Sequence, residues 1–162
     1  MIPLTTSRTE FLKELMTSKG LKLSLAESRT GGMISSEITD LSGSSEFFLG
    51  SAVTYSNESK ESILGVSRSS LIEFGAVSEA VAKEMALGSL KVYGSDIAGS
   101  VTGIAGPNGG TPQKPVGTVW MAVTDGKRTA AYENHFEGSR NRVRELTSDV
   151  LMVRILEFIA SR

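Results

Sequence analysis

A lysine that follows an aromatic-rich segment is the first candidate for chemistry in this sequence. With Asn57 as a helix cap, Lys60 falls at the third helical position, where the helix dipole disfavours a cation by about 0.3–1 kcal/mol. The same field, with desolvation, lowers the pKa of a lysine toward the range of a general base. A nearby serine can then be deprotonated without histidine, and Tyr55 can relay the proton or hold an oxyanion. The alternative is a core Tyr55, a solvated Lys60 and a plain turn at 43–45.

A second candidate lies where a predicted strand passes into a predicted helix. The residues concerned are Glu27, Ser28, Arg29, Thr30, Gly31 and Gly32. Free backbone amides and the helix dipole at such a junction favour an anion, so the segment is a candidate phosphate or carboxylate cradle. It matches neither the dinucleotide-binding fingerprint nor the P-loop pattern, and glycine pairs also occur in ordinary turns. A structural turn therefore stays open as the alternative.

The third candidate is a glycine- and proline-rich loop over 102–117. It begins with Thr102, Gly103, Ile104, Ala105 and Gly106. Glycine permits close backbone approach to a ligand, and successive amides can form an anion nest or an oxyanion hole. Prolines at 107, 112 and 115 fix φ and argue against a floppy loop, which leaves ligand contact and a rigid structural turn as the two readings.

Arginines at the start of the last predicted helix form a weaker candidate. Arg140 and Arg144 are four residues apart and share a helix face, which could clamp a phosphate. A solvated basic turn is the alternative. His135, at the end of a predicted strand, is more typical of a structural histidine than of a catalyst.

Composition excludes several classes of site and partner. The chain has no cysteine and one histidine, which removes thiolate nucleophiles and disfavours a zinc site or a Ser-His-Asp triad. Seventeen basic and eighteen acidic residues leave a formal charge of −1, so no global basic field exists to bind nucleic acid or a membrane surface. We expect no metal, no cofactor, no nucleic-acid partner and no membrane span, and we expect a cytoplasmic protein.

The pattern of elements predicts one α/β domain over residues 1–162. Helices are expected after a capping box at Ser7, over 33–41, from Asn57 to Leu64, after Ser78 and after Ser139. Strands are expected over 21–26, 47–55, 97–101, 118–123 and 129–136, with Asp125-Gly126 as a hairpin turn. The simplest architecture is a three-layer α/β/α sandwich around a mixed, mostly parallel sheet with an antiparallel hairpin, which receives ligands where strands run into loops.

Five ordered blocks over nearly the whole chain carry a family resemblance. They lie at 26–32, 43–45, 53–60, 75–79 and 102–120. In these blocks the sequence resembles the CinA carboxy-terminal domain family, the nicotinamide-nucleotide amidohydrolases, in their standalone form. The resemblance implies hydrolysis of the carboxamide of nicotinamide mononucleotide to nicotinate mononucleotide and ammonia, in NAD recycling. It also implies a homodimer.

The resemblance also implies roles for particular residues. Ser45 would be the nucleophile, Lys60 its general base and Tyr55 the assisting phenol. The residues implied to bind the oxyanion or the nucleotide are Glu27, Ser28, Thr30, Gly31, Gly32, Thr102, Gly103, Ala105, Gly106 and Arg140. The family's first motif usually has cysteine where this chain has Arg29, which could strengthen phosphate binding, block the pocket or point to solvent. The alternative function is a non-catalytic nucleotide-binding or competence-associated module.

Overall fold

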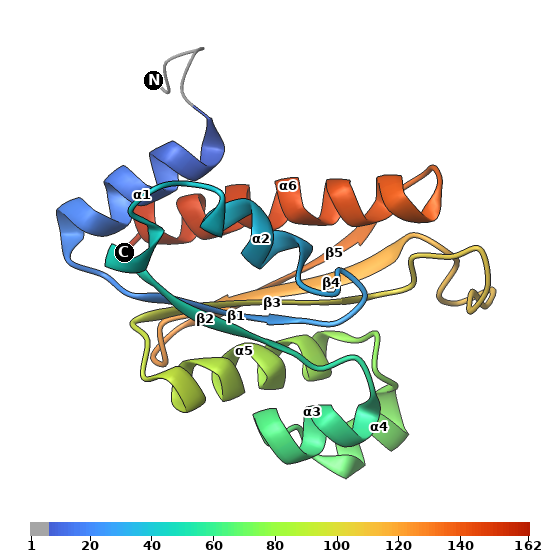
Figure 1. Cartoon of the computed structure of the whole chain (residues 1–162). Coiled ribbons are helices and arrows are strands. Elements are labelled where there is room, and N and C mark those ends of the chain that lie inside the picture. Colours follow the sequence, from blue (N-terminus) through green and yellow to red (C-terminus); the bar gives the residue numbers. More distant parts are fainter. Residues whose placement is uncertain (1–6) are drawn as a thin grey trace.

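A five-stranded mixed sheet forms the middle layer of the computed structural model, which describes residues 7–162 (Figure 1). Its strands are β1 (Leu23–Glu27), β2 (Phe48–Val53), β3 (Ile97–Gly103), β4 (Thr118–Thr124) and β5 (Thr129–His135). They lie in the order β2-β1-β3-β4-β5. β2, β1 and β3 are parallel, whereas β4 runs antiparallel to both β3 and β5. The expected mixed sheet with a terminal hairpin is confirmed.

Helices cover both faces of this sheet, so the three-layer α/β/α architecture is also confirmed. The layer above the sheet in Figure 1 consists of α1 (Arg8–Lys19), α2 (Met33–Thr39) and α6 (Arg140–Ala160). The layer below consists of α3 (Asn57–Leu64), α4 (Arg68–Phe74) and α5 (Glu79–Tyr93). A single 3-10 turn, η1 (Ser44–Glu46), precedes β2.

The core lies on both sides of β1 and β3, whose residues are all buried. On the upper side Met16, Leu151 and Ile155 are fully buried against the sheet. On the lower side Val81 and Met85 of α5 do the same. Burying large apolar side chains contributes roughly 1.5–3 kcal/mol each, so packing on both faces holds β1 and β3 firmly in the sheet.

Side-chain caps fix most helix ends where the sequence predicted them. Ser7 forms the expected capping box with Glu10, Gly20 ends α1 in the left-handed conformation, and Ser78 and Ser139 cap α5 and α6. One cap was predicted wrongly: Ser56, not Asn57, caps α3 by accepting a hydrogen bond from the amide of Ser59. Lys60 therefore occupies the fourth helical position.

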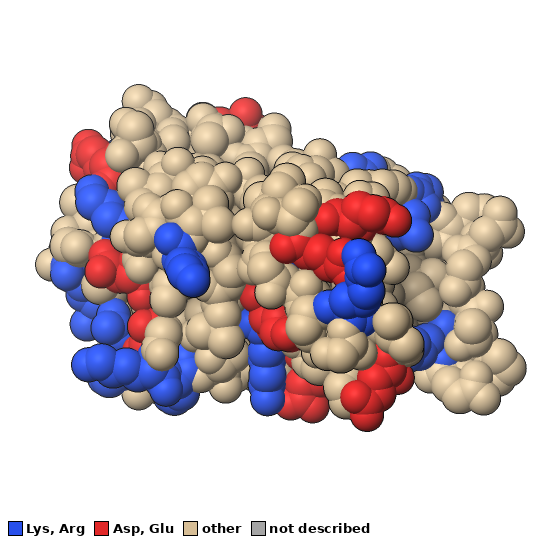
Figure 2. Space-filling view, turned by 90° about the horizontal axis from the view of Figure 1, so that it is seen from below, with Lys and Arg blue, Asp and Glu red and all other residues tan. Residues whose placement is uncertain are grey.

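Other differences from the prediction include a missed helix and several element ends that shift by one or two residues. α4 was not predicted, because it is only seven residues long and has no buried residue to give an apolar periodicity. β3 extends through Gly103, so the loop after it covers 104–117. Within the described residues, no helix is both long and apolar enough to cross a membrane. The lower face carries acidic and basic side chains together, with large uncharged areas between them (Figure 2).

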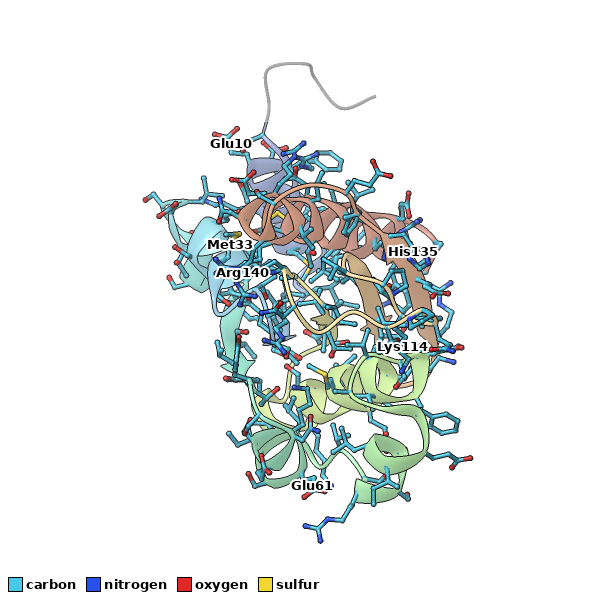
Figure 3. The ribbon with its side chains drawn as sticks, turned by 90° about the vertical axis from the view of Figure 1, so that its right-hand side faces the viewer. Glu10, Met33, Glu61, Lys114, His135 and Arg140 are labelled. Atoms are coloured by element: carbon cyan, nitrogen blue, oxygen red, sulfur yellow. The ribbon has the colours of Figure 1, made fainter. Side chains whose placement is uncertain are left out.

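The carboxyl ends of β1, β2 and β3 meet at one edge of the sheet, because the three strands are parallel neighbours. Three segments leave the sheet there: the turn after Glu27, the short connection from β2 to α3, and the loop after Gly103. Figure 3 looks onto this end of the molecule, with Arg140 and Lys114 labelled near it. In open α/β sheets this edge is where ligands bind, so it is the place to search for a site.

Candidate functional site

A buried serine–lysine pair lies at this edge of the sheet. Lys60 is only 1% exposed, and its Nζ donates hydrogen bonds to Ser28 Oγ over 3.1 Å and to the carbonyl of Thr54 over 2.8 Å. Ser28 directly follows β1 and is also buried. Because β1 and β2 are parallel neighbours, the residue after β1 and the helix after β2 come together although they are 32 positions apart.

The surroundings of Lys60 favour its neutral form. Burial and, to a smaller extent, the positive charge of Arg29 together lower the pKa of Lys60 from the ordinary value of 10.5 to about 8. No carboxylate pairs with Lys60 within the described part of the chain, so its amine is held by neutral oxygens alone. A lysine with a pKa near 8 is a competent general base close to neutral pH.

Glu27 organises the turn that presents Ser28. Its carboxylate is fully buried and accepts hydrogen bonds from the Thr30 hydroxyl over 2.8 Å and from the amides of Ile34 and Ser35 over 3.0 and 3.2 Å. The hydroxyls of Ser35 and Ser51 also donate to it. With five donors already in place, Glu27 supports the turn, and it does not line the pocket described below.

Tyr55 stands at the rim of the same site between two arginines. Its hydroxyl accepts hydrogen bonds from Arg29 over 2.8 Å and from Arg140 over 3.2 Å, and both contacts lower the pKa of Tyr55. The Arg29 guanidinium also lies 5.0 Å from the centre of the Tyr55 ring. Arg29 is exposed, and its side chain lies at the rim of the pocket in contact with Tyr55.

A pocket of about 100 Å³ opens beside these groups. Its walls are formed by the serine–lysine pair, the rim residues, the segment before α5 and the loop after β3. The lining residues are Ser28, Arg29, Tyr55, Asn57, Lys60, Ala76, Val77, Thr102, Gly103, Ile104 and Gly109. Five of the residues expected at the site line it, namely Ser28, Tyr55, Lys60, Thr102 and Gly103. The volume suits a small head group rather than a whole nucleotide, since complete ligand pockets usually measure about 300–1,000 Å³.

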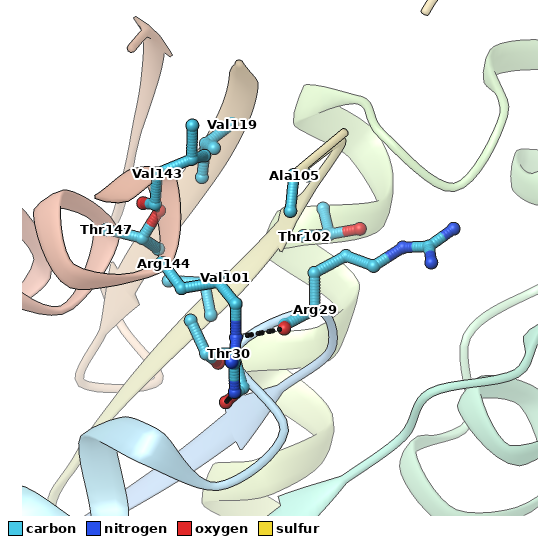
Figure 4. Close-up of a pocket in the computed structure, with 10 residues that line it drawn as sticks. Arg29, Thr30, Val101, Thr102, Ala105, Val119, Val143, Arg144 and Thr147 are labelled. Atoms are coloured by element: carbon cyan, nitrogen blue, oxygen red, sulfur yellow. Dashed lines mark hydrogen bonds between the residues drawn. The ribbon is translucent and has the colours of Figure 1, made fainter. Parts of the chain in front are cut away.

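A second pocket shares Thr102 with the first and is far smaller, with a volume of about 10 Å³ (Figure 4). Thr30 and Ala105 line this one, with Val143 and Arg144 of α6. Such a space holds about one water molecule. Arg144 donates to the carbonyls of Arg29 and Thr30, and in Figure 4 the Arg29 side chain extends away from it. Arg144 is therefore tied to the turn that carries Ser28.

Three of the other expected ligand residues, Gly31, Gly32 and Gly106, lie outside the pocket wall. Gly31 and Gly32 have φ values of 60° and 100°, which L side chains rarely adopt, so these two glycines make the tight turn possible. Neither lines the pocket. The carbonyl of Gly106 accepts a hydrogen bond from Arg140 over 2.8 Å and so holds this arginine near the rim.

Within one chain the structure does not bring Ser45 to Lys60. Ser45 belongs to η1, which precedes β2, whereas Lys60 follows β2. The amide of Leu23, at the start of β1, bonds to the carbonyl of Phe47, so Ser45 lies at the opposite edge of the sheet from Ser28. A five-residue strand spans roughly 17 Å, which is too far for proton transfer to Lys60 within one chain. Ser28, expected only as a ligand contact, is the hydroxyl at the lysine.

Several residues of the pocket were not predicted. Asn57 was assigned a capping role, and Ala76 and Val77 were not singled out for ligand contact, whereas Gly109 lies in the loop over 102–117 that was. Ala76 also accepts a hydrogen bond from the Thr102 hydroxyl over 2.9 Å, which joins the segment before α5 to the end of β3. The sequence signals for these positions were the block at 75–79 and the glycine-rich loop over 102–117.

Fold and site together define an α/β protein with a buried serine–lysine pair at the carboxyl edge of a mixed sheet. The family model described as the CinA C-terminal domain matches residues 5–159. A CinA-like protein of Citrifermentans bemidjiense is 48% identical over 148 residues, which cover 91% of this chain and 36% of the relative. One of Geobacter metallireducens is 50% identical over 138 residues, 85% of this chain and 33% of the relative. The chain belongs to the CinA C-terminal domain family.

Solved structures agree with this assignment. The competence damage-inducible protein A of Klebsiella pneumoniae is 33% identical and superposes with a TM-score of 0.91, covering 94% of this chain and 95% of that one. A competence-damaged protein (CinA) superfamily member of Escherichia coli is also 33% identical, with a TM-score of 0.90 over 93% and 88% of the two chains. The present chain spans about a third of the length of the curated relatives named above.

Proposed function

We propose that this protein hydrolyses the carboxamide of nicotinamide mononucleotide to nicotinate mononucleotide and ammonia, with Ser28 as nucleophile and Lys60 as general base. The observation that carries the proposal is the hydrogen bond from the buried Lys60 amine to the buried Ser28 hydroxyl, in a pocket and with no carboxylate paired to the lysine within the described residues. This pairing supplies an activated nucleophile without histidine, cysteine or carboxylate. The substrate itself comes from the family resemblance of the sequence.

The chemistry follows from the positions of these two side chains. Neutral Lys60 Nζ takes the proton of Ser28 Oγ as this oxygen attacks the amide carbon, and a tetrahedral oxyanion forms. Lys60 then returns the proton to the leaving nitrogen, so ammonia departs and a Ser28 ester remains. Water loses a proton to Lys60 and attacks the ester carbon, which releases the carboxylate and restores the Ser28 hydroxyl.

Backbone amides next to Ser28 are suited to hold the oxyanion. The amides of Arg29 and Thr30 donate no hydrogen bond to any group within residues 7–162. Both follow the proposed nucleophile, and an amide after the nucleophile contributes to the oxyanion hole in other serine hydrolases. Removing one such donor typically costs about 10²–10³-fold in kcat. The turn is braced by Glu27 and Arg144, which favours preorganised donors.

The test is ammonia release from nicotinamide mononucleotide by the wild-type protein and three variants. Ser28→Ala and Lys60→Met should each lose at least about 10³-fold in kcat, because each removes one half of the pair. Ser45→Ala is the matched control, since it deletes the same hydroxyl at the far edge of the sheet, and it should stay within about threefold of wild type. Circular dichroism and melting curves check that all four proteins are folded.

Two results would defeat the proposal. Activity that survives in Ser28→Ala but disappears in Ser45→Ala would move the nucleophile to the other edge. Nucleotide binding by folded wild-type protein with no ammonia released would favour a non-catalytic nucleotide-binding module instead.

A further inference from the structure

Two arginines converge on one neutral oxygen at the rim of the pocket. Arg29 comes from the turn after β1, and Arg140 is the first residue of α6, 111 positions later. Their guanidinium nitrogens lie 2.8 and 3.2 Å from the same Tyr55 hydroxyl. Bringing two like charges to one phenol costs free energy unless an anion offsets it, so the arrangement needs an explanation.

Neither arginine has an acidic partner within the described residues. Five other arginines do form ion pairs within 4.0 Å: Arg8, Arg68, Arg142, Arg154 and Arg162. Surface arginines in this chain are thus usually matched by a carboxylate, whereas the two at the pocket rim are bonded only to a hydroxyl and to the Gly106 carbonyl. Their charge remains available to a ligand.

The arginines are also held in place. The Nη1 atom of Arg140 is fixed on the Gly106 carbonyl over 2.8 Å, which leaves Nη2 directed at Tyr55. The backbone of Arg29 is fixed by Arg144, which donates to its carbonyl over 3.1 Å. A guanidinium restrained in this way loses less entropy on binding an oxyanion, and its planar fork matches a phosphate group.

The size of the pocket places these charges relative to a substrate. About 100 Å³ next to Ser28 and Lys60 accommodates a carboxamide-bearing ring, so the rest of a nucleotide must extend past the rim. Arg29 and Tyr55 are themselves part of the pocket wall, and Arg140 adjoins Tyr55 from outside.

We propose that Arg29 and Arg140 form a paired-guanidinium site for the phosphate monoester of the substrate, and that Arg29 makes the chain selective for a phosphorylated over an unphosphorylated amide. The inference rests on the proposed function, because it assumes that the amide end of the ligand enters the pocket. The Tyr55 hydroxyl, which accepts from both arginines in the free site, is placed to donate to a phosphate oxygen when the ligand is bound.

The experiment measures binding separately from turnover. Calorimetry with Ser28→Ala protein gives the affinity for nicotinamide mononucleotide, for nicotinamide riboside, which lacks the phosphate, and for inorganic phosphate. Adding Arg29→Ser should weaken binding of the mononucleotide about 10- to 100-fold, as expected for loss of a charge-assisted contact, and leave the riboside within about twofold. Arg142→Ser is the matched control. Arg142 is an exposed arginine in the same turn of α6 as Arg140, but it pairs with Glu145.

Each outcome decides the proposal. Equal losses for mononucleotide and riboside, or no loss for either, would overturn it, as would inorganic phosphate that binds equally well with and without the Arg29 side chain. Ammonia release is then followed in proteins that keep Ser28. If wild-type protein releases none while Arg29→Ser selectively weakens the mononucleotide, the proposed hydrolysis fails and the phosphate site stands. If wild-type and Arg29→Ser proteins hydrolyse both amides with the same selectivity, the phosphate site fails and the hydrolysis stands.

Discussion

The Lys60 amine reaches the Ser28 hydroxyl over 3.1 Å, from the helix after one strand to the turn after its parallel neighbour. Both side chains are buried, and the second hydrogen bond of the amine goes to the Thr54 carbonyl. The pair is therefore created by strand order, because β1 and β2 are parallel neighbours and end side by side.

The rate of amide hydrolysis should depend on pH through Lys60. Since burial and Arg29 lower the pKa of Lys60 to about 8, kcat/KM should rise about tenfold per pH unit below 8 and level off above it. Measurement from pH 7 to 10 avoids the second ionisation of the substrate phosphate, which lies near 6. A flat profile over this range would contradict the role of Lys60 as base.

Folding stability should depend on the same ionisation. Between pH 8 and 10.5 the unfolded chain binds a proton at Lys60 that the folded chain has lost, so the free energy of unfolding rises with pH across this window. The gain is about 3 kcal/mol in full, and it is absent below the folded-state pKa. Urea unfolding at pH 7 and at pH 10 gives the difference in the free energy of unfolding between wild type and Lys60→Met. This difference should be larger at pH 10 by the gain described. A difference that is independent of pH would show that Lys60 is not buried as described.

Glu27→Gln should loosen the turn that carries Ser28. The amide keeps one of the two acceptor oxygens, so several of the five donors around Glu27 lose their buried partner. We expect about 2–4 kcal/mol of lost stability and a lower kcat. The thermal unfolding of Glu27→Gln is compared with that of Glu14→Gln, because Glu14 is exposed on α1. Equal melting temperatures for the two variants would refute the bracing role of Glu27.

Gly88→Ala should disturb α3, the helix that holds Lys60. A Cβ at Gly88 would lie 2.0 Å from the Leu64 carbonyl oxygen at the end of α3, and this backbone cannot yield without moving the helix. We expect a loss of about 3 kcal/mol together with reduced kcat. Leu87→Ala, at the adjacent exposed position, should cost less than about 1 kcal/mol. A Gly88→Ala protein as stable as Leu87→Ala would contradict the close contact between α5 and α3.

Much of the fold was readable from the sequence because local signals decide it. Capping serines at 7, 78 and 139 and the Asp-Gly hairpin turn each act within a few residues, and all are confirmed. α4 gave no such signal, since none of its residues is buried. The cap of α3 was misplaced by one position because Ser56 and Asn57 are both good caps.

The choice of serine needed information that local patterns lack. Lys60 and Tyr55 were identified from one segment, but their partner depends on which strand lies beside β2. Ser45 is closer to Lys60 in sequence, yet the whole length of β2 separates the two. The predicted strand over 47–55 already implied this separation, whereas the neighbourhood of Ser28 follows only from the parallel pairing of β1 and β2.

The most direct measurement of the central claim is the covalent intermediate. Wild-type and Ser45→Ala proteins are mixed with nicotinamide mononucleotide, quenched in acid within milliseconds and digested for mass spectrometry. The account predicts an ester of nicotinate mononucleotide on the peptide that contains Ser28 in both proteins, and none in Ser28→Ala. An ester on the Ser45 peptide, or steady ammonia release with no ester on either peptide, would contradict it.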